Sequence, residues 1–269
     1  MNLRRRRLGV AEASQREIDA RRAMGVALPG RNTVLWSSIV FTAASILLLL
    51  QFTTLHYNWP FGGGPISSAW AHEVDVLGAL SCIGWFVGFS LLIDWIVFDT
   101  FPVWGASRRA LIGATLKLIA SAFFCVEPFS DLTGYLQSVK VIGGVPWSNF
   151  VGILFFHCGN VIDAVGMFPM INWSDLFSLG NTPPIAMIVY MSATWFLVFA
   201  NGIAYLSTPA PGGPEVNVGS ASNFVAPGHV TGACLLTVGS LMYTAWSYVL
   251  GRHSVEPEPL LSITPIGVP

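Results

Sequence analysis

The sequence predicts an all-α membrane protein, a polytopic bundle of about six transmembrane helices with both termini in the cytoplasm. Three observations carry this prediction: scarce charge, long apolar stretches, and an uneven placement of arginine and lysine. Of the 269 residues, 53% are hydrophobic and 10% are charged, and the mean hydropathy is +0.63. A soluble domain carries about 25% charged residues. This chain therefore has too few to cover a surface that faces water, and a bilayer is its natural solvent.

Six stretches are long enough to span a membrane, which takes about 20 predominantly apolar residues. In chain order they are Thr33–Leu55, Val74–Phe98, Ala110–Val126, Val145–Met170, Pro184–Leu206 and Val230–Leu250. Because lipid offers backbone groups no hydrogen-bond partners, these stretches should be helices. We expect a basic cytoplasmic N-terminal segment at 1–32, a six-span domain at 33–250 and a proline-rich cytoplasmic tail at 251–269.

The positively charged residues predict the orientation. Eight arginines precede the first predicted span, and six spans place Arg108, Arg109 and Arg252 on the same side, with Lys140 alone on the other. Connectors rich in arginine and lysine stay in the cytoplasm. Both ends of the chain are therefore predicted to be cytoplasmic.

The predicted partners are the lipid bilayer and, through a basic run near the N-terminus, anionic lipid. That run is Arg4, Arg5, Arg6 and Arg7, and each basic side chain near an anionic surface contributes about 1 kcal/mol. Protein partners and self-association stay open, and we expect no nucleic-acid partner.

Ionisable residues within the spans are candidate functional residues, because each charge costs about 2.5–3.5 kcal/mol on insertion scales. Asp94, Lys117 and Asp163 lie in the second, third and fourth predicted spans. At a rise of about 1.5 Å per residue, the predicted orientation places them within ~10 Å of one depth, near the cytoplasmic surface. Three interpretations follow. The charges reach water from the helix ends, form an ion-paired knot between spans, or form a cytoplasm-facing ion or proton site.

A second group of polar residues lies on the fourth span. His157 and Asn160 are three residues apart, as are Asn160 and Asp163, so Asn160 neighbours each of them. His157 and Asp163 point to different faces, which argues against a catalytic dyad. We favour a hydrogen bond from His157 to a neighbouring helix. The alternative is a tetrapyrrole, for which Cys158 and Gly159 would leave room; the prediction is that no cofactor is bound.

Short blocks with a small residue in mid-helix recur along the chain. They are Val87–Leu91, Cys158–Ile162, Phe199–Ile203 with Asn201, and Val238–Met242. Ordinary packing between membrane helices uses such small residues. The blocks also resemble the helix-pair repeats of YrhK-type membrane proteins, over residues 147–246. This resemblance implies a small helical membrane protein of uncharacterised activity and brings no catalytic residues with it.

The sequence contains no recognisable catalytic or metal-binding motif. There is no GxSxG elbow, HExxH, phosphate loop or histidine pair at metal-ligand spacing. The four cysteines lie within apolar runs in no CxxC arrangement, which predicts neither a disulfide framework nor a zinc site. We therefore expect a non-catalytic structural, interaction or sensor-like membrane subunit rather than an enzyme. The alternative is a small transporter or channel for an ion or proton, using a layer of Asp94, Lys117 and Asp163.

Overall fold

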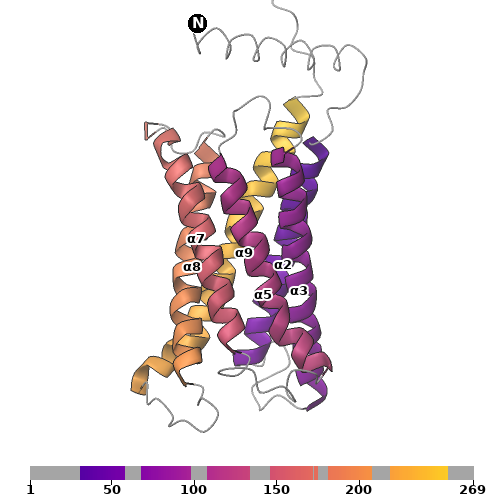
Figure 1. Cartoon of the computed structure of the whole chain (residues 1–269), viewed down its shortest axis with the longest axis vertical. Coiled ribbons are helices and arrows are strands. Elements are labelled where there is room, and N and C mark those ends of the chain that lie inside the picture. The colour runs from indigo at the N-terminus through magenta and orange to yellow at the C-terminus, as the bar shows by residue number, and fades with distance from the viewer. Residues whose placement is uncertain are drawn as a thin grey trace, which may run out of the picture.

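The computed structural model describes residues 31–57, 68–97, 108–133, 146–171, 173–174, 181–207 and 219–253. Within these ranges the chain forms six long helices (Figure 1). They are α2 (Arg31–Tyr57), α3 (Ser68–Trp95), α5 (Arg108–Thr133), α7 (Pro146–Met167), α8 (Thr182–Ser207) and α9 (Val225–His253). Short 3-10 helices, η2 (Phe168–Met170) and η4 (Gly219–Phe224), follow α7 and precede α9. The basic run Arg4–Arg7, Lys140 and the tail beyond His253 lie outside the described residues.

All six of these helices are long and apolar enough to cross a membrane, with candidate spans of 21 to 27 residues. This confirms the predicted fold class. The helices also run past several predicted bounds. The clearest case is α5, which continues through Pro128 to Thr133 instead of ending at Val126. Proline is tolerated within membrane helices where neighbouring groups satisfy the freed carbonyl.

The helices form a ring, because each packs against the next in sequence and α9 packs back against α2. Figure 1 shows α2 beginning and α9 ending at the same end of the ring, which we call the N/C end. The opposite end is called the far end. The tightest neighbours are α2–α3, α5–α7 and α8–α9, which we call the first, second and third hairpins. The placement of the arginines predicts that the N/C end faces the cytoplasm, and this orientation stays a prediction.

Small residues seven positions apart mark the inward face of each of these helices. They are Ser37/Ala44 on α2, Ser81/Gly88 on α3, Gly113/Ala120 on α5, Gly152/Gly159 on α7, Ala186/Ala193 on α8 and Gly232/Gly239 on α9, all buried. Seven residues make about two helical turns, so both members share one face and let the backbones approach closely. This spacing sets the packing register of the ring.

One larger buried residue stands four positions after the first small residue of each pair. These residues are Phe41, Trp85, Lys117, Phe156, Tyr190 and Leu236. All except Lys117 belong to a single core cluster at the centre of the ring. In each hairpin, the one on the first helix lies against the second glycine of the partner helix. The contacting pairs are Phe41 with Gly88, Lys117 with Gly159 and Tyr190 with Gly239. The ring is therefore three similar hairpins, and the second has a lysine where the others have aromatic rings.

Candidate functional site

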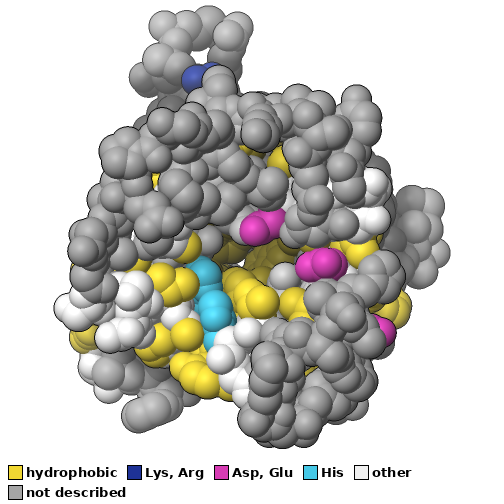
Figure 2. Space-filling model, turned by 90° about the horizontal axis from the view of Figure 1, so that it is seen from below, with side chains coloured by type: hydrophobic (Ala, Val, Ile, Leu, Met, Phe, Trp, Pro, Cys, Tyr) yellow, Lys and Arg dark blue, Asp and Glu magenta, His cyan; other side chains and the backbone are white. Residues whose placement is uncertain are grey.

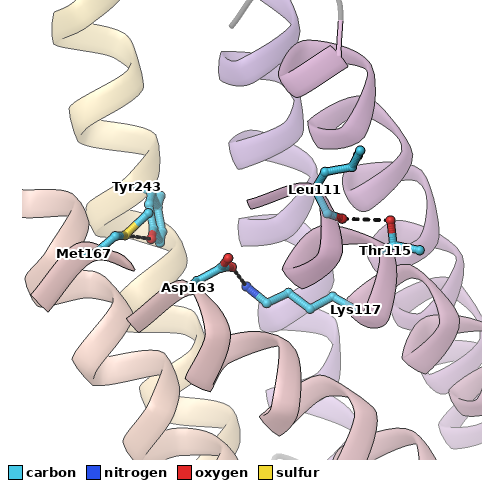
Figure 3. A network of polar contacts seen from close by, with 6 residues as sticks. All are labelled: Leu111, Thr115, Lys117, Asp163, Met167 and Tyr243. Carbon is cyan, nitrogen blue, oxygen red and sulfur yellow. Dashed lines mark hydrogen bonds and ion pairs between the residues drawn. The ribbon is translucent and has the colours of Figure 1, made fainter. Parts of the chain in front are cut away.

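The candidate site is an ion pair at the centre of the second hairpin. The ammonium of Lys117 on α5 donates a hydrogen bond to the carboxylate of Asp163 on α7, as Figure 3 shows. The two side chains are only 6% and 12% exposed. Two glycines provide the space: a Cβ at Gly113 would overlap the carboxylate, and one at Gly159 would lie 2.8 Å from Lys117 Cγ. The pair thus fills room that side chains at those positions would remove.

The structure pairs two of the three charges of the predicted layer and leaves Asp94 apart from them. Asp94 is exposed on α3, and among the described residues the ion pair of Lys117 is with Asp163. The reason is the direction of the side chain around the helix. Asp94 lies six residues past Gly88 and is therefore turned about 240° from that inward glycine. Its depth was predicted from residue count, which says nothing about the face it occupies.

The third hairpin has an uncharged pair at the same two positions. Tyr190 is the counterpart of Lys117, and Tyr243 is the counterpart of Asp163. Asp163 lies four residues past Gly159, and Tyr243 lies four residues past Gly239. The two tyrosine rings are 5.6 Å apart between centroids. The hydroxyl of Tyr190 also lies 2.5 Å from that of Ser240. Here an aromatic and hydroxyl arrangement replaces the ion pair.

The first hairpin is uncharged at these positions as well. Phe41 belongs to the core cluster and Leu92 packs against it. The third hairpin also touches the charged one, because the hydroxyl of Tyr243 donates to the sulfur of Met167, 3.9 Å away. Figure 3 shows this contact beside the ion pair. Charge at the centre of a hairpin is thus confined to α5 and α7.

His157 makes the interhelical hydrogen bond that the sequence analysis favoured. Its Nδ1 lies 2.8 Å from the hydroxyl of Thr194 on α8, and its ring packs edge-on against Trp195 with centroids 4.6 Å apart. Asp163 bonds to Lys117 on a different helix. His157 and Asp163 therefore serve separate interfaces, as their spacing predicted.

The two candidate asparagines differ in their surroundings. Asn160 is only 1% exposed, and its amide nitrogen has no hydrogen-bond partner among the described residues. Asn201 donates to the carbonyl oxygen of Leu197, one turn earlier in α8, at 2.8 Å. Asn201 is thus satisfied within its own helix, whereas Asn160 brings an unpaired donor into the ring.

Sequence reasoning missed a polar seam between α2 and α9. Side-chain pairs bridge these helices at three levels. The pairs are Thr42 with Thr244 at 2.9 Å, Ser45 with Ser240 at 3.1 Å, and His56 Nε2 with His229 Nδ1 at 3.0 Å. Their members are 173 to 202 residues apart in the chain. Only the closure of the ring brings them together, and no local sequence pattern predicts these contacts.

The arrangement offers hydrogen bonding and charge rather than a recognisable reaction centre. In the described part of the chain, no group of three or more His, Cys, Asp or Glu side chains is placed to hold a metal ion. No protein-family model, curated protein or solved structure matches the sequence. The resemblance to YrhK-type proteins therefore stays a prediction.

Proposed function

We propose that the protein is a non-catalytic, sensor-like membrane protein in which Lys117 and Asp163 form a charge lock between α5 and α7. The observation that carries this proposal is the contrast among the hairpins. Three similar hairpins build the ring, and the first and third place uncharged residues at the positions of the pair. The architecture therefore does not require a lysine and an aspartate there.

Stability alone does not account for the charges. Replacing a buried ion pair by well-packed apolar residues is often neutral, or stabilising by about 1–4 kcal/mol. An ion pair differs from an aromatic pair because a proton or a competing ion can neutralise one member and leave the other unpaired. A local change of charge is then converted into a change of helix packing.

The close approach of the two helices makes such a change stepwise. A Cβ on Gly159 would lie 2.8 Å from the carbonyl oxygen of Gly113, so α5 and α7 are closer here than a residue with a Cβ would permit. Tightly packed interfaces shift between discrete arrangements rather than deforming continuously. Loss of the Lys117–Asp163 attraction would therefore favour a second, looser packing of the hairpin.

Distance measurements between α5 and α7 test this proposal. Spin labels at Ile112→Cys and Val165→Cys, two exposed positions, would report the separation in nanodiscs, with the native cysteines replaced by alanine. We expect the wild-type distance distribution to shift on acidification and Asp163→Asn to show the shifted distribution at neutral pH. The doubly substituted Lys117→Phe, Asp163→Leu carries the first hairpin's residues and should keep the resting distribution throughout. An acid-induced shift in that double variant equal to the wild type would refute the lock.

A second candidate function is proton or cation transport, favoured by two polar regions with apolar residues between them. In three helices a polar, an apolar and a polar residue follow one another along the chain. These sets are Ser45, Phe52 and His56 on α2; Lys117, Phe124 and Glu127 on α5; and His229, Leu236 and Ser240 on α9. The middle residue of each set belongs to the core cluster or packs against it. Polar sites separated by an apolar layer suit alternating exposure to the two sides of a membrane.

Proton flux into liposomes separates the two functions. A lumenal pH indicator would follow flux driven by a pH gradient, with empty liposomes and the Asp94→Asn protein as references. The charge-lock proposal predicts that liposomes with the protein show no more proton flux than empty liposomes. A flux that Asp163→Asn abolishes and Asp94→Asn preserves would assign transport instead.

A further inference from the structure

The far end of the seam between α2 and α9 holds two facing imidazoles. His56 Nε2 and His229 Nδ1 are 3.0 Å apart, and the rings are nearly stacked, with centroids 5.2 Å apart and planes at 25°. The ring of Phe52 stacks on His229, with centroids 4.5 Å apart, and lies 6.1 Å from His56. His229 is 7% exposed, and its Nε2 has no hydrogen-bond partner among the described residues. A single hydrogen bond therefore leaves this pair only partly satisfied.

The far face of the ring is hollowed (Figure 2). Figure 2, which looks onto this end, shows histidine side chains along one edge and acidic side chains across from them. The described acidic residues near this end are Glu73 and Asp75 on α3 and Glu127 on α5. The described residues of the far end include no lysine or arginine. An acidic cleft of this kind raises the local concentration of cations.

The spacing of the two nitrogens suits a shared metal ion. Two nitrogen ligands of a tetrahedral ion, with bonds of about 2.0–2.1 Å, lie about 3.3–3.4 Å apart. The observed 3.0 Å is shorter than this separation, so the rings must turn before both nitrogens face one ion. Imidazole nitrogen suits Zn²⁺, Cu²⁺ and Ni²⁺ rather than Mg²⁺ or Ca²⁺, which take oxygen ligands.

We propose that His56 and His229 bind a divalent transition-metal ion such as Zn²⁺, which enters from the hollow. Each ring keeps its one proton on the nitrogen turned away from the ion, so binding needs a tautomer shift and no net proton release. Water completes the coordination. With two protein ligands the site is open and exchangeable, unlike the four-ligand sites that hold structural zinc. It stands apart from the Lys117–Asp163 pair and does not depend on the function proposed for that pair.

Such an ion would join the first and last helices of the ring. The two ligands are 173 residues apart in the chain, and the remaining bridges of this seam are hydroxyl pairs. Binding of an ion to the folded ring and not to the unfolded chain stabilises the folded state by mass action. Metal uptake and closure of the ring are therefore coupled.

Titration of the metal-free, full-length protein with Zn²⁺ by calorimetry tests the site. The reference is a His72→Gln, His253→Gln background, which removes two histidines outside this pair. We expect one ion per chain in that background, and affinity at least about tenfold weaker after His56→Gln or His229→Gln. His157→Gln is the matched control, because His157 also makes a hydrogen bond but faces a hydroxyl; its affinity should be unchanged.

Two further measurements keep the proposal falsifiable. X-ray absorption at the zinc edge should show two imidazole nitrogens in the reference protein and fewer after His56→Gln. That variant carries the test if His229→Gln does not fold, because His56 is only half-buried. Unchanged affinity after His56→Gln, or Mg²⁺ binding as tight as Zn²⁺ binding, would overturn the assignment.

Discussion

The second and third hairpins have the same packing and different centres. In both, a buried side chain of the first helix lies against a glycine of the second helix. The residue four positions past that glycine contacts the same buried side chain. The second hairpin uses Lys117 and Asp163, and the third uses Tyr190 and Tyr243. The small residues determine how closely the helices approach. The central pair is then free to carry another property, and in the second hairpin that property is charge.

The largest loss of unfolding free energy is expected when the Lys117–Asp163 ion pair is broken. Lys117→Met leaves the Asp163 carboxylate buried and unpaired, which costs about 3–5 kcal/mol. Unfolding of the detergent-solubilised protein measures this loss. Adding Asp163→Asn should restore part of it, and adding Asp94→Asn should not. Strictly additive losses in both double variants would mean that neither carboxylate is the partner.

A graded series of alanine substitutions should rank the glycines by what a Cβ would meet. Gly159→Ala meets the backbone of Gly113 at 2.8 Å and should cost about 1–3 kcal/mol. Gly239→Ala meets the ring of Tyr190 at 3.1 Å and should cost less, because a ring can move. Gly166→Ala meets nothing within 4 Å and should stabilise by up to about 1 kcal/mol through helix propensity. Unfolding free energies in any other order would contradict the packing argument.

The uncharged centre should tolerate change better. Tyr190→Phe removes the hydroxyl that lies 2.5 Å from Ser240, and hydrogen bonds between membrane helices contribute about 0.6 kcal/mol on average. A double-mutant cycle with Ser240→Ala isolates this contribution from the loss of Ser240's contact with Ser45. Zero coupling energy would mean that the tyrosine ring alone fills the position.

The smallest effect is expected at the charge outside the ring. Asp94 is exposed, so Asp94→Asn should change the unfolding free energy by no more than about 0.5 kcal/mol. The same detergent unfolding assay applies. A loss comparable to that of Lys117→Met would restore Asp94 to the charged layer and contradict its exposed placement.

Hydropathy alone predicts the six helices, because each is long and apolar by itself. Residue count along the spans also predicts that Lys117 and Asp163 share a depth. It cannot distinguish Asp163 from Asp94, because depth says nothing about direction around the helix. The seven-residue spacing of small residues supplies that direction: Lys117 lies four positions past Gly113, on the inward face, as Phe41 does past Ser37.

The sequence does not predict which helices that are distant in the chain pack against each other. His56 and His229 are far apart in the sequence and form no histidine pair at metal-ligand spacing. Their contact depends on α2 and α9 being neighbours, which follows from closing the ring. Hydroxyl groups on an apolar helix carry no signal that selects one partner helix among five.

Closure of the ring by its first and last helices also has a consequence for biosynthesis. The seam side of α2 enters the membrane before α9 has been translated, so its hydroxyls must wait for their partners. Each has an interim acceptor on its own helix: Thr42 donates to the carbonyl of Ser38 at 3.0 Å, and Ser45 to that of Phe41 at 2.8 Å. The nascent α2 can thus reside in lipid with these groups satisfied. Assembly of the ring finishes only when the last helix arrives.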